Sequence, residues 1–277
     1  MAVEYDEIGI WSEVKLAIVR EYAAAYSKIM EGTRRDRINR LSWIYIDAYA
    51  GPGYHLSKTT RETVEGSPLI ALNTIPPFHE YHFIDTEPAR EQQLRTIAGN
   101  RQDVYTYTED CNTVLLRDVF PRAKHSDYRR ALCLLDPYNI NLTWDVIEAA
   151  GKSGSIEIFL NFMIMDINRN ALRKRMEKGL QSKVDQLTRL VGDESWKDAG
   201  YREIETLFGT DYQKVSNEEF AEWFRQRLIN KAGFKHVPKP MPMKTKSNAV
   251  IYYLYFATQN TAGLKIVNDI FRKYGQR

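Results

Sequence analysis

The sequence predicts an α/β fold with a doubly wound, mostly parallel sheet of about seven strands. Three apolar segments with the composition of buried strands each end in an acid, at Asp47, Asp85 and Asp136. Helical patterns alternate with these strands, and the carboxyl ends of parallel strands share one edge of a sheet. We therefore expect the three acids to lie together along that edge.

The strand at 43–47 runs into a turn that contains Gly51 and Gly53. Glycine adopts positive φ angles without strain and lets a ligand approach bare backbone. The turn is thus a candidate ligand loop, and Asp47 could accept hydrogen bonds from the cationic or hydroxyl-bearing part of a nucleotide-like ligand. An ordinary strand-to-turn junction is the alternative interpretation.

Helix signals lie on both sides of this strand. Residues 12–31 have apolar side chains at helical spacing after Ser12, a suitable N-cap. Ser67 as N-cap, with Pro68 at the first helical position, predicts another helix start. The polar stretch 54–65 before it is either a lid or a surface loop.

Two further strands also lead to acids. The strand at 81–84 precedes Asp85 and a predicted helix over 88–98, and an acid in this place commonly binds ribose hydroxyls. The strand at 104–107 precedes Asp110. That acid either holds an adenine amino group or caps the helix that follows it.

The strand at 131–135 ends in Asp136-Pro137-Tyr138. Pro137 removes a backbone donor and stiffens the turn. A carboxylate and a carbonyl there can accept hydrogens from an amine while the tyrosine ring stacks on a planar base, which suits alkylation of an amino group. A strand-end turn with a packed tyrosine is the alternative. Asn161, in the next strand at 156–162, faces either the core or the crevice, and we favour the core.

The pattern changes after Asn168. The stretch 169–246 reads as a helical insertion without strands, with helices predicted at 171–190, 194–207 and 217–232. Its basic residues are either a phosphate platform or a solvated surface. The domain prediction is a core at 1–168, the insertion at 169–246, and a closing part at 247–277 with a strand at 249–257 and a helix at 264–274.

Composition narrows the class of protein. The 277 residues are 43% hydrophobic and 27% charged, which is ordinary for a globular protein. No apolar run approaches the ~20 residues of a membrane span, and the first residues lack a signal pattern, so we expect a cytoplasmic protein with no membrane partner. Two cysteines make neither a disulfide framework nor a four-cysteine zinc site. His79 and His82 have no third ligand nearby, so we expect no metal.

Together these motifs resemble a class I, Rossmann-like S-adenosylmethionine-dependent methyltransferase. Over nearly the whole chain the sequence also resembles the three-Cys-motif partner proteins, which are named after a companion protein with three cysteines. The resemblance is carried by the following residues: Trp11, Lys15, Asp47, Ala48, Tyr49, Ala50, Gly51, Pro52, Gly53, Gly66-Ser67-Pro68, Phe83-Ile84-Asp85, Leu135-Asp136-Pro137-Tyr138 and the 253–257 strand.

The resemblance implies a role for each strand end. It places the methionine part of S-adenosylmethionine on the turn from Ala50 to Gly53, with Asp47 close to its amino group. Asp85 would hold the ribose hydroxyls and Asp110 the adenine amine. Asp136, Pro137 and Tyr138 would receive the target amine, although the second proline of the Asp-Pro-Pro-Tyr motif is missing here.

Two functional hypotheses follow. The first is a methyltransferase acting on a nucleobase amino group in nucleic acid or a nucleotide. The second is a non-catalytic partner or regulatory module that works with a three-cysteine companion through the insertion. A nicotinamide dehydrogenase would share the glycine turn and the ribose acid, but it has no evident use for Asp136-Pro137-Tyr138.

Overall fold

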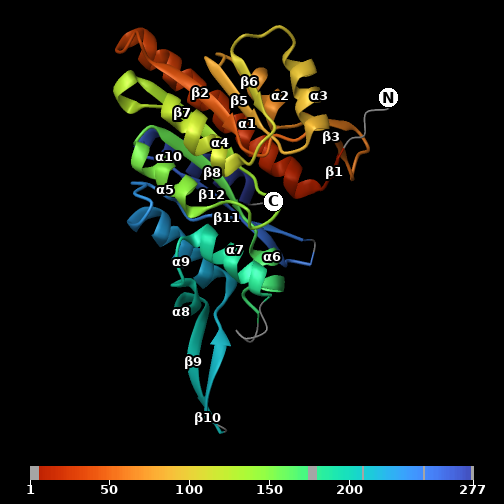
Figure 1. Cartoon of the computed structure of the whole chain (residues 1–277). Coiled ribbons are helices and arrows are strands. Elements are labelled where there is room, and N and C mark those ends of the chain that lie inside the picture. The colour runs from red at the N-terminus through yellow and green to blue at the C-terminus, as the bar shows by residue number, and fades with distance from the viewer. Residues whose placement is uncertain (1–5, 174–179, 208, 246, 276–277) are drawn as a thin grey trace.

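The computed structural model describes residues 6–173, 180–207, 209–245 and 247–275, and its centre is a seven-stranded sheet (Figure 1). The strand order is β11-β12-β8-β7-β2-β5-β6. Only β12 is reversed, antiparallel to both of its neighbours. The predicted α/β fold class is confirmed. The strands are β2 (Ser42–Asp47), β5 (Glu80–Ile84), β6 (Val104–Tyr107), β7 (Arg129–Leu135), β8 (Ile156–Phe162), β11 (Met241–Lys244) and β12 (Val250–Ala257).

Helices cover both faces of this sheet, as near-continuous apolar strands require. Every residue of β8 is buried. One face packs against α1 (Ile10–Asp36), α2 (Ser67–Leu72), α3 (Pro88–Ala98) and α10 (Thr261–Gly275). The other packs against α4 (Cys111–Val114), a π turn at Leu115–Val119, α5 (Trp144–Ser153), α6 (Ile164–Asn170), α7 (Gln181–Val191), α8 (Trp196–Gly200) and α9 (Asn217–Asn230).

Two helix starts differ from the prediction by one to three positions. Helix α1 begins at Ile10 with Gly9 as its N-cap rather than Ser12, because the Ser12 amide already donates to the Gly9 carbonyl. Helix α2 begins at Ser67, and Gly66 occupies the cap position. Pro68 lies in the first turn of α2, as predicted. Backbone amides of the first turn have no acceptor within the helix, so the missing N–H of proline costs no hydrogen bond there.

The polar stretch 54–65 folds into a small sheet. Strands β3 (Tyr54–Ser57) and β4 (Thr63–Glu65) form a hairpin, and β1 (Asp6–Ile8) pairs with β3 in parallel. The Ser57 hydroxyl donates to Glu13 of α1 at 2.8 Å, and Arg20 pairs with Glu65 at 2.9 Å. These bonds fix the small sheet to α1, beside the glycine turn.

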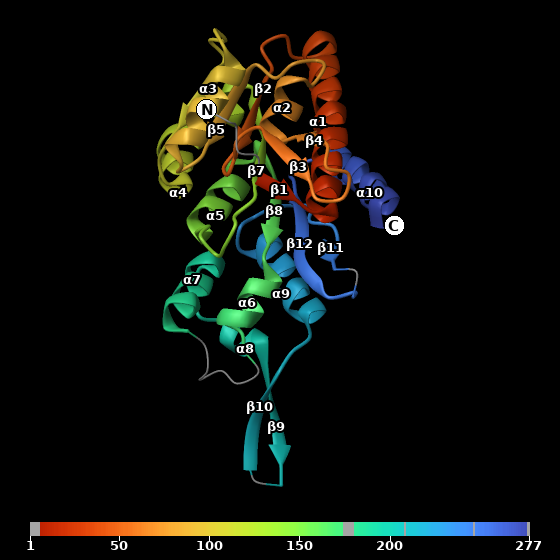
Figure 2. The ribbon, with the colours of Figure 1, turned by 90° about the vertical axis from the view of Figure 1, so that its right-hand side faces the viewer.

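The prediction that 169–246 contains no strand is wrong. Strands β9 (Tyr201–Thr206) and β10 (Gly209–Lys214) form an antiparallel hairpin that projects from the body of the molecule (Figure 2). The charged residues of 201–206 have a composition typical of a helix, yet each residue of β9 pairs with a residue of β10. β11 also comes from this stretch and joins the central sheet. Helix α9 confirms the helix predicted near 217–232, whereas Lys174, Arg175 and Lys178 lie outside the described residues.

The histidines of the β5 region have protein partners. The buried His82 ring stacks on Tyr105 with centroids 4.9 Å apart, and its Nδ1 lies 3.0 Å from the Tyr107 hydroxyl. Within the described ranges, no group of three or more His, Cys, Asp or Glu is arranged for a metal ion. No helix in those ranges is long and apolar enough to cross a bilayer.

Candidate active site

The strand order reverses between β2 and β7. From β2 the chain proceeds outward to β5 and β6, then returns to place β7 on the other side of β2 and continues outward to β8. Ligands of open α/β sheets bind at such a reversal, outside the carboxyl ends of the strands. Asp47 ends β2 and Asp136 directly follows β7, so these two acids flank the reversal, with Asp85 one strand away. The predicted gathering of the three acids is confirmed.

The glycine turn is held by its neighbours on both sides. The Ala48 amide donates to Leu134 of β7 at 3.0 Å, and the Ala50 amide donates to Ile84 of β5 at 2.9 Å. Gly51 and Gly53 have φ angles of +66° and +86°, a region that L side chains enter only with strain. The turn therefore has a fixed shape at the carboxyl edge of the sheet.

Asp85 is part of that fixed shape. Its Oδ2 accepts a hydrogen bond from the Gly51 amide at 3.0 Å, and its Oδ1 accepts one from the Glu87 amide at 2.9 Å. The side chain is almost completely buried. A carboxylate oxygen has two lone pairs, so each oxygen can still accept another hydrogen. Asp85 thus joins the turn to the end of β5 and keeps capacity for a ligand.

Asp47 is fully buried and only half satisfied. Its Oδ1 accepts from the Tyr49 amide at 3.4 Å, whereas its Oδ2 is buried with no hydrogen-bond partner in the described part of the chain. Burial raises the pKa of Asp47 to about 7, against the lowering effect of the Ser67 hydroxyl. A buried carboxylate without a partner is costly. Asp47 is therefore suited to a cationic ligand group.

Asp136 forms a network that sequence reasoning missed. Its Oδ2 pairs with the ammonium of Lys15, a buried residue of α1, and its Oδ1 accepts from the Asn161 side-chain amide of β8. Asn161 is buried but points to this acid, so the placement in the core that we favoured is wrong. The two donors fix the orientation of the Asp136 carboxylate, whose side chain is about a quarter exposed (26%).

Pro137 is buried, whereas Tyr138 is 60% exposed and contacts Arg90. The Arg90 guanidinium lies 5.7 Å from the centre of the Tyr138 ring and 3.5 Å from its hydroxyl. Arg90 also lies 3.6 Å from Asp85 and 3.1 Å from Asp6 of β1. This cation connects Tyr138, Asp85 and the small sheet. No sequence motif marks it, because its partners come from three separate segments.

A cavity of about 150 Å³ lies beside Arg90, which is one of its lining residues. Five of the predicted residues line it, namely Ala48, Tyr49, Asp85, Asp110 and Tyr138. Asp110 also caps α4 through the Thr113 amide at 3.1 Å, which confirms the capping alternative. Asp47, Asp136 and the two glycines lie at the same strand ends but do not line this cavity.

His55 is a further residue that the sequence did not single out. It belongs to β3 and lies against the glycine turn, with its Cε1 3.8 Å from the point where a Cβ on Gly51 would stand. Its Nδ1 is buried without a partner in the described residues. Burial lowers the pKa of His55, which favours the neutral imidazole.

Comparison with known proteins gives distant structural likenesses only. No protein-family profile matches the chain, and no curated protein sequence is significantly similar to it. A protein from Legionella pneumophila is 9% identical, with a TM-score of 0.48 over 94% of this chain and 92% of the other. A "putative methyltransferase" from Thermobifida fusca is 14% identical, with a TM-score of 0.45 over 90% and 80%. A "putative S-adenosylmethionine dependent methyltransferase" from Listeria monocytogenes is 12% identical, with a TM-score of 0.42 over 87% and 99%. These likenesses are too distant to assign an activity.

Proposed function

We propose that the protein is an S-adenosylmethionine-dependent methyltransferase that acts on an amino group of a nucleobase, in nucleic acid or in a nucleotide. The observation that carries the proposal is the set of three acids at the strand reversal. Asp47 has a free buried oxygen, Asp85 holds the glycine turn, and Asp136 is oriented next to an exposed tyrosine. The sheet supports the proposal, because seven strands with only β12 reversed, next to the edge strand β11, are characteristic of class I methyltransferases.

The residues present fit the cofactor. The unpartnered Oδ2 of Asp47 suits the ammonium of its methionine part, and the turn from Ala50 to Gly53 would lie beside that part. Asp85 would accept from the ribose hydroxyls and Asp110 from the adenine amine. When bound, S-adenosylmethionine supplies an activated methyl group, so the protein must chiefly position the acceptor in line with it.

Positioning of the acceptor falls to Asp136 and Tyr138. Lys15 and Asn161 each occupy one lone pair of the Asp136 carboxylate, and the remaining lone pairs can accept the hydrogens of an amino group. The exposed Tyr138 ring offers a face on which a planar base can stack.

Calorimetry with S-adenosylmethionine and its demethylated product tests the proposal. We expect binding that Asp85→Ala weakens by ~1.5–3 kcal/mol for each charge-assisted hydrogen bond lost. Asp103→Ala is the control, since Asp103 is a partly exposed acid that pairs with Arg101 and lies at the opposite end of β6. Absence of cofactor binding by the folded protein contradicts the proposal. If nucleic acid is the substrate, its affinity falls with salt with a slope of roughly −0.7 to −0.9 per phosphate contacted.

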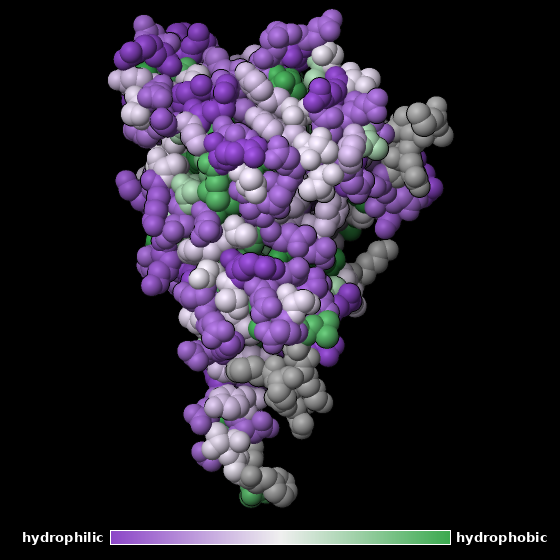
Figure 3. All heavy atoms as spheres, in the orientation of Figure 1, coloured by the Kyte–Doolittle hydropathy of each residue, from purple (hydrophilic) through white to green (hydrophobic). Residues whose placement is uncertain are grey.

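The β9–β10 hairpin favours a second candidate function, a partner module that works with a three-cysteine companion. Leu207 is 99% exposed and Tyr212 is 53% exposed. The face of the molecule in Figure 3 is largely hydrophilic, with hydrophobic atoms visible at the end of this hairpin. A projecting apolar tip suits a protein contact. Co-purification with the companion, lost in Leu207→Ser and Tyr212→Ser, together with no methyl transfer to nucleic acids, would favour this function.

A further inference from the structure

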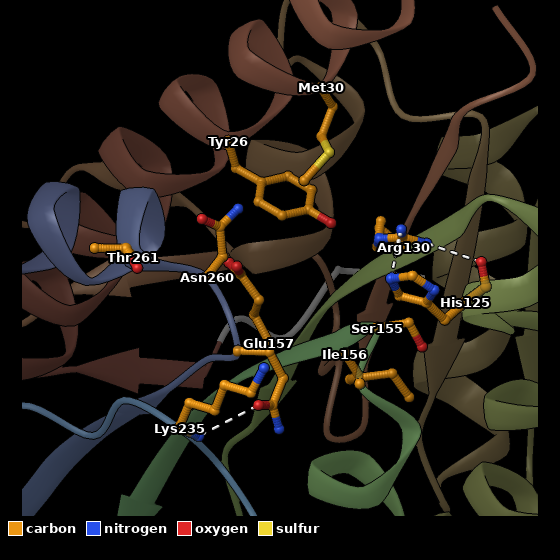
Figure 4. Close-up of a pocket in the computed structure, with 12 residues that line it drawn as sticks. Tyr26, Met30, His125, Arg130, Ser155, Ile156, Glu157, Lys235, Asn260 and Thr261 are labelled. Atoms are coloured by element: carbon orange, nitrogen blue, oxygen red, sulfur yellow. Dashed lines mark hydrogen bonds between the residues drawn. The ribbon is translucent and has the colours of Figure 1, made fainter. Parts of the chain in front are cut away.

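A second cavity lies at the opposite, amino-terminal edge of the central sheet. Its volume is about 390 Å³, more than twice that of the cavity beside Asp85. The residues on which the argument rests are Tyr26, Arg130, Glu157, Lys235, Asn260 and Thr261 (Figure 4). They come from α1, the first residues of β7 and β8, the segment after α9 and the start of α10. Along β7, Arg130 lies roughly 20 Å from Asp136, and along β8, Glu157 lies roughly 13 Å from Asn161.

The cavity carries positive charge that the protein does not neutralise. Among the described residues, neither Arg130 nor Lys235 forms an ion pair with a carboxylate. Arg130 donates instead to the Arg129 carbonyl at 2.9 Å and lies 2.9 Å from Nε2 of His125. The Arg130 charge lowers the pKa of His125, so this imidazole stays neutral and serves as an acceptor. The guanidinium therefore keeps its full charge at the cavity wall.

Among the described residues that line the cavity, Glu157 is the one carboxyl group, and it is already hydrogen-bonded within the protein. Glu157 accepts hydrogen bonds from the Tyr22 hydroxyl at 2.5 Å and the Thr258 hydroxyl at 2.7 Å, one on each oxygen. Burial raises the pKa of Glu157. Its role is thus internal to the protein, and the two cations remain available to a ligand.

Tyr26 provides a donor without a partner. The residue is only 3% exposed, yet its hydroxyl forms no hydrogen bond within the described residues. Figure 4 shows this hydroxyl directed from α1 into the space between Met30 and Arg130. Burial raises the pKa of Tyr26 well above its ordinary value, so the hydroxyl keeps its proton and can donate. A buried hydroxyl left without a partner costs free energy that a ligand oxygen would recover.

The start of α10 adds to the positive electrostatic potential of the cavity. Asn260 and Thr261 line the cavity, and the Asn260 side chain accepts from the Ala262 amide at 2.9 Å, which fixes the first turn of a fifteen-residue helix. The amino end of a helix carries a partial positive charge. Met30, Ile156 and the Tyr26 ring supply apolar surface within the cavity. The cavity thus combines an anion-binding wall with an apolar one.

We propose that this cavity binds a small organic phosphate monoester, with the phosphate held by Arg130, Lys235 and the Tyr26 hydroxyl and the organic part against Met30 and Ile156. Two unneutralised cations suit a group that carries nearly two negative charges at pH 7. A planar guanidinium, an ammonium and a hydroxyl also suit an anion with several acceptor oxygens. The site is independent of the proposed methyltransferase activity, because it shares no residue with the crevice.

Calorimetric titration of the full chain with phenyl phosphate at low salt tests the proposal. We expect saturable binding that Arg130→Gln weakens about ten- to a hundred-fold, the loss of a charge-assisted hydrogen bond. Tyr26→Phe should weaken it roughly two- to ten-fold. The control is Lys152→Gln, which removes the same charge from an exposed pair with Glu148 and should leave binding unchanged.

Thermal unfolding separates a ligand-binding role of Tyr26 from a structural one. Because the hydroxyl has no partner, Tyr26→Phe should leave the melting temperature of the free protein unchanged or raised, while it reduces the rise caused by phenyl phosphate. A clear fall in the melting temperature of the free variant would show that the hydroxyl bonds within the protein and would overturn the proposal. The proposal would also be overturned if the wild-type protein did not bind phenyl phosphate at millimolar concentration. It would equally be overturned if Arg130→Gln and Tyr26→Phe bound phenyl phosphate as tightly as the wild-type protein does.

Discussion

The pKa of Asp47 makes cofactor binding dependent on pH in a direction that can be calculated. The free protein holds this buried carboxyl with a pKa of about 7, so near pH 6 most molecules carry a proton on Asp47. A ligand ammonium needs the ionised form. Apparent affinity then scales with the ionised fraction, which rises from about one-tenth near pH 6 to about nine-tenths near pH 8. We therefore expect about tenfold tighter binding at the higher pH.

Calorimetry with S-adenosylhomocysteine is the suitable assay, because this product lacks the sulfonium and keeps its amino group protonated over the range. Asp47→Asn should bind more weakly, by ~1.5–3 kcal/mol, and its affinity should not change between about pH 6 and pH 8. Equal affinity of the wild-type protein at both pH values would refute this reasoning. A pH dependence that persists in Asp47→Asn would assign the titration to another group and refute it as well.

Three further predictions concern stability, measured by denaturant unfolding. The pKa of Asp47 is higher in the folded protein than in the unfolded chain, so the native state holds a proton that the unfolded chain releases. The free energy of unfolding of the wild-type protein therefore falls from about pH 4 to pH 7. Asp47→Asn should be more stable than wild type by roughly 3–5 kcal/mol near pH 8. Equal stability of the two would contradict the pKa. Lys15→Met should destabilise the folded protein by about 1–3 kcal/mol, because it leaves the Asp136 carboxylate without its cation. This loss is smaller than for a fully buried ion pair, since Asp136 is partly exposed. An unchanged midpoint would contradict it. Gly53→Ala and Gly99→Ala should each cost about 1–2 kcal/mol of backbone strain, and Gly53→Ala should cost more in total because its Cβ would lie 2.6 Å from Ile97 Cδ1. Only Gly53→Ala should also weaken cofactor binding, since Gly99 lies at the end of α3 in open space. Equal cofactor affinity in both would contradict the role of the turn.

The parts of the fold that the sequence predicted well depend on neighbouring residues. The strands at 104–107 and 156–162 have the predicted bounds, and the helix at 88–98 does too. Apolar runs that end at acids, prolines or glycines set these limits locally. The hairpin at 201–214 was missed for the same reason, because its strands carry charged or other polar side chains on most positions and are stabilised by pairing across the turn rather than by an apolar face.

The candidate site shows the same division between local and distant causes. Strand-end motifs located Asp47, Asp85 and Asp136, but nothing near Asp136 in the chain indicates that Lys15, 121 residues earlier, neutralises it. The ion pair also explains why α1 must pack with its first turns at the crevice, since Lys15 is buried there and has no other carboxylate partner among the described residues. A change in α1 that shifts Lys15 would therefore alter the acceptor acid directly. The chemistry of the Asp136-Pro137-Tyr138 motif is thus a property of the helix packed against it as much as of the motif itself.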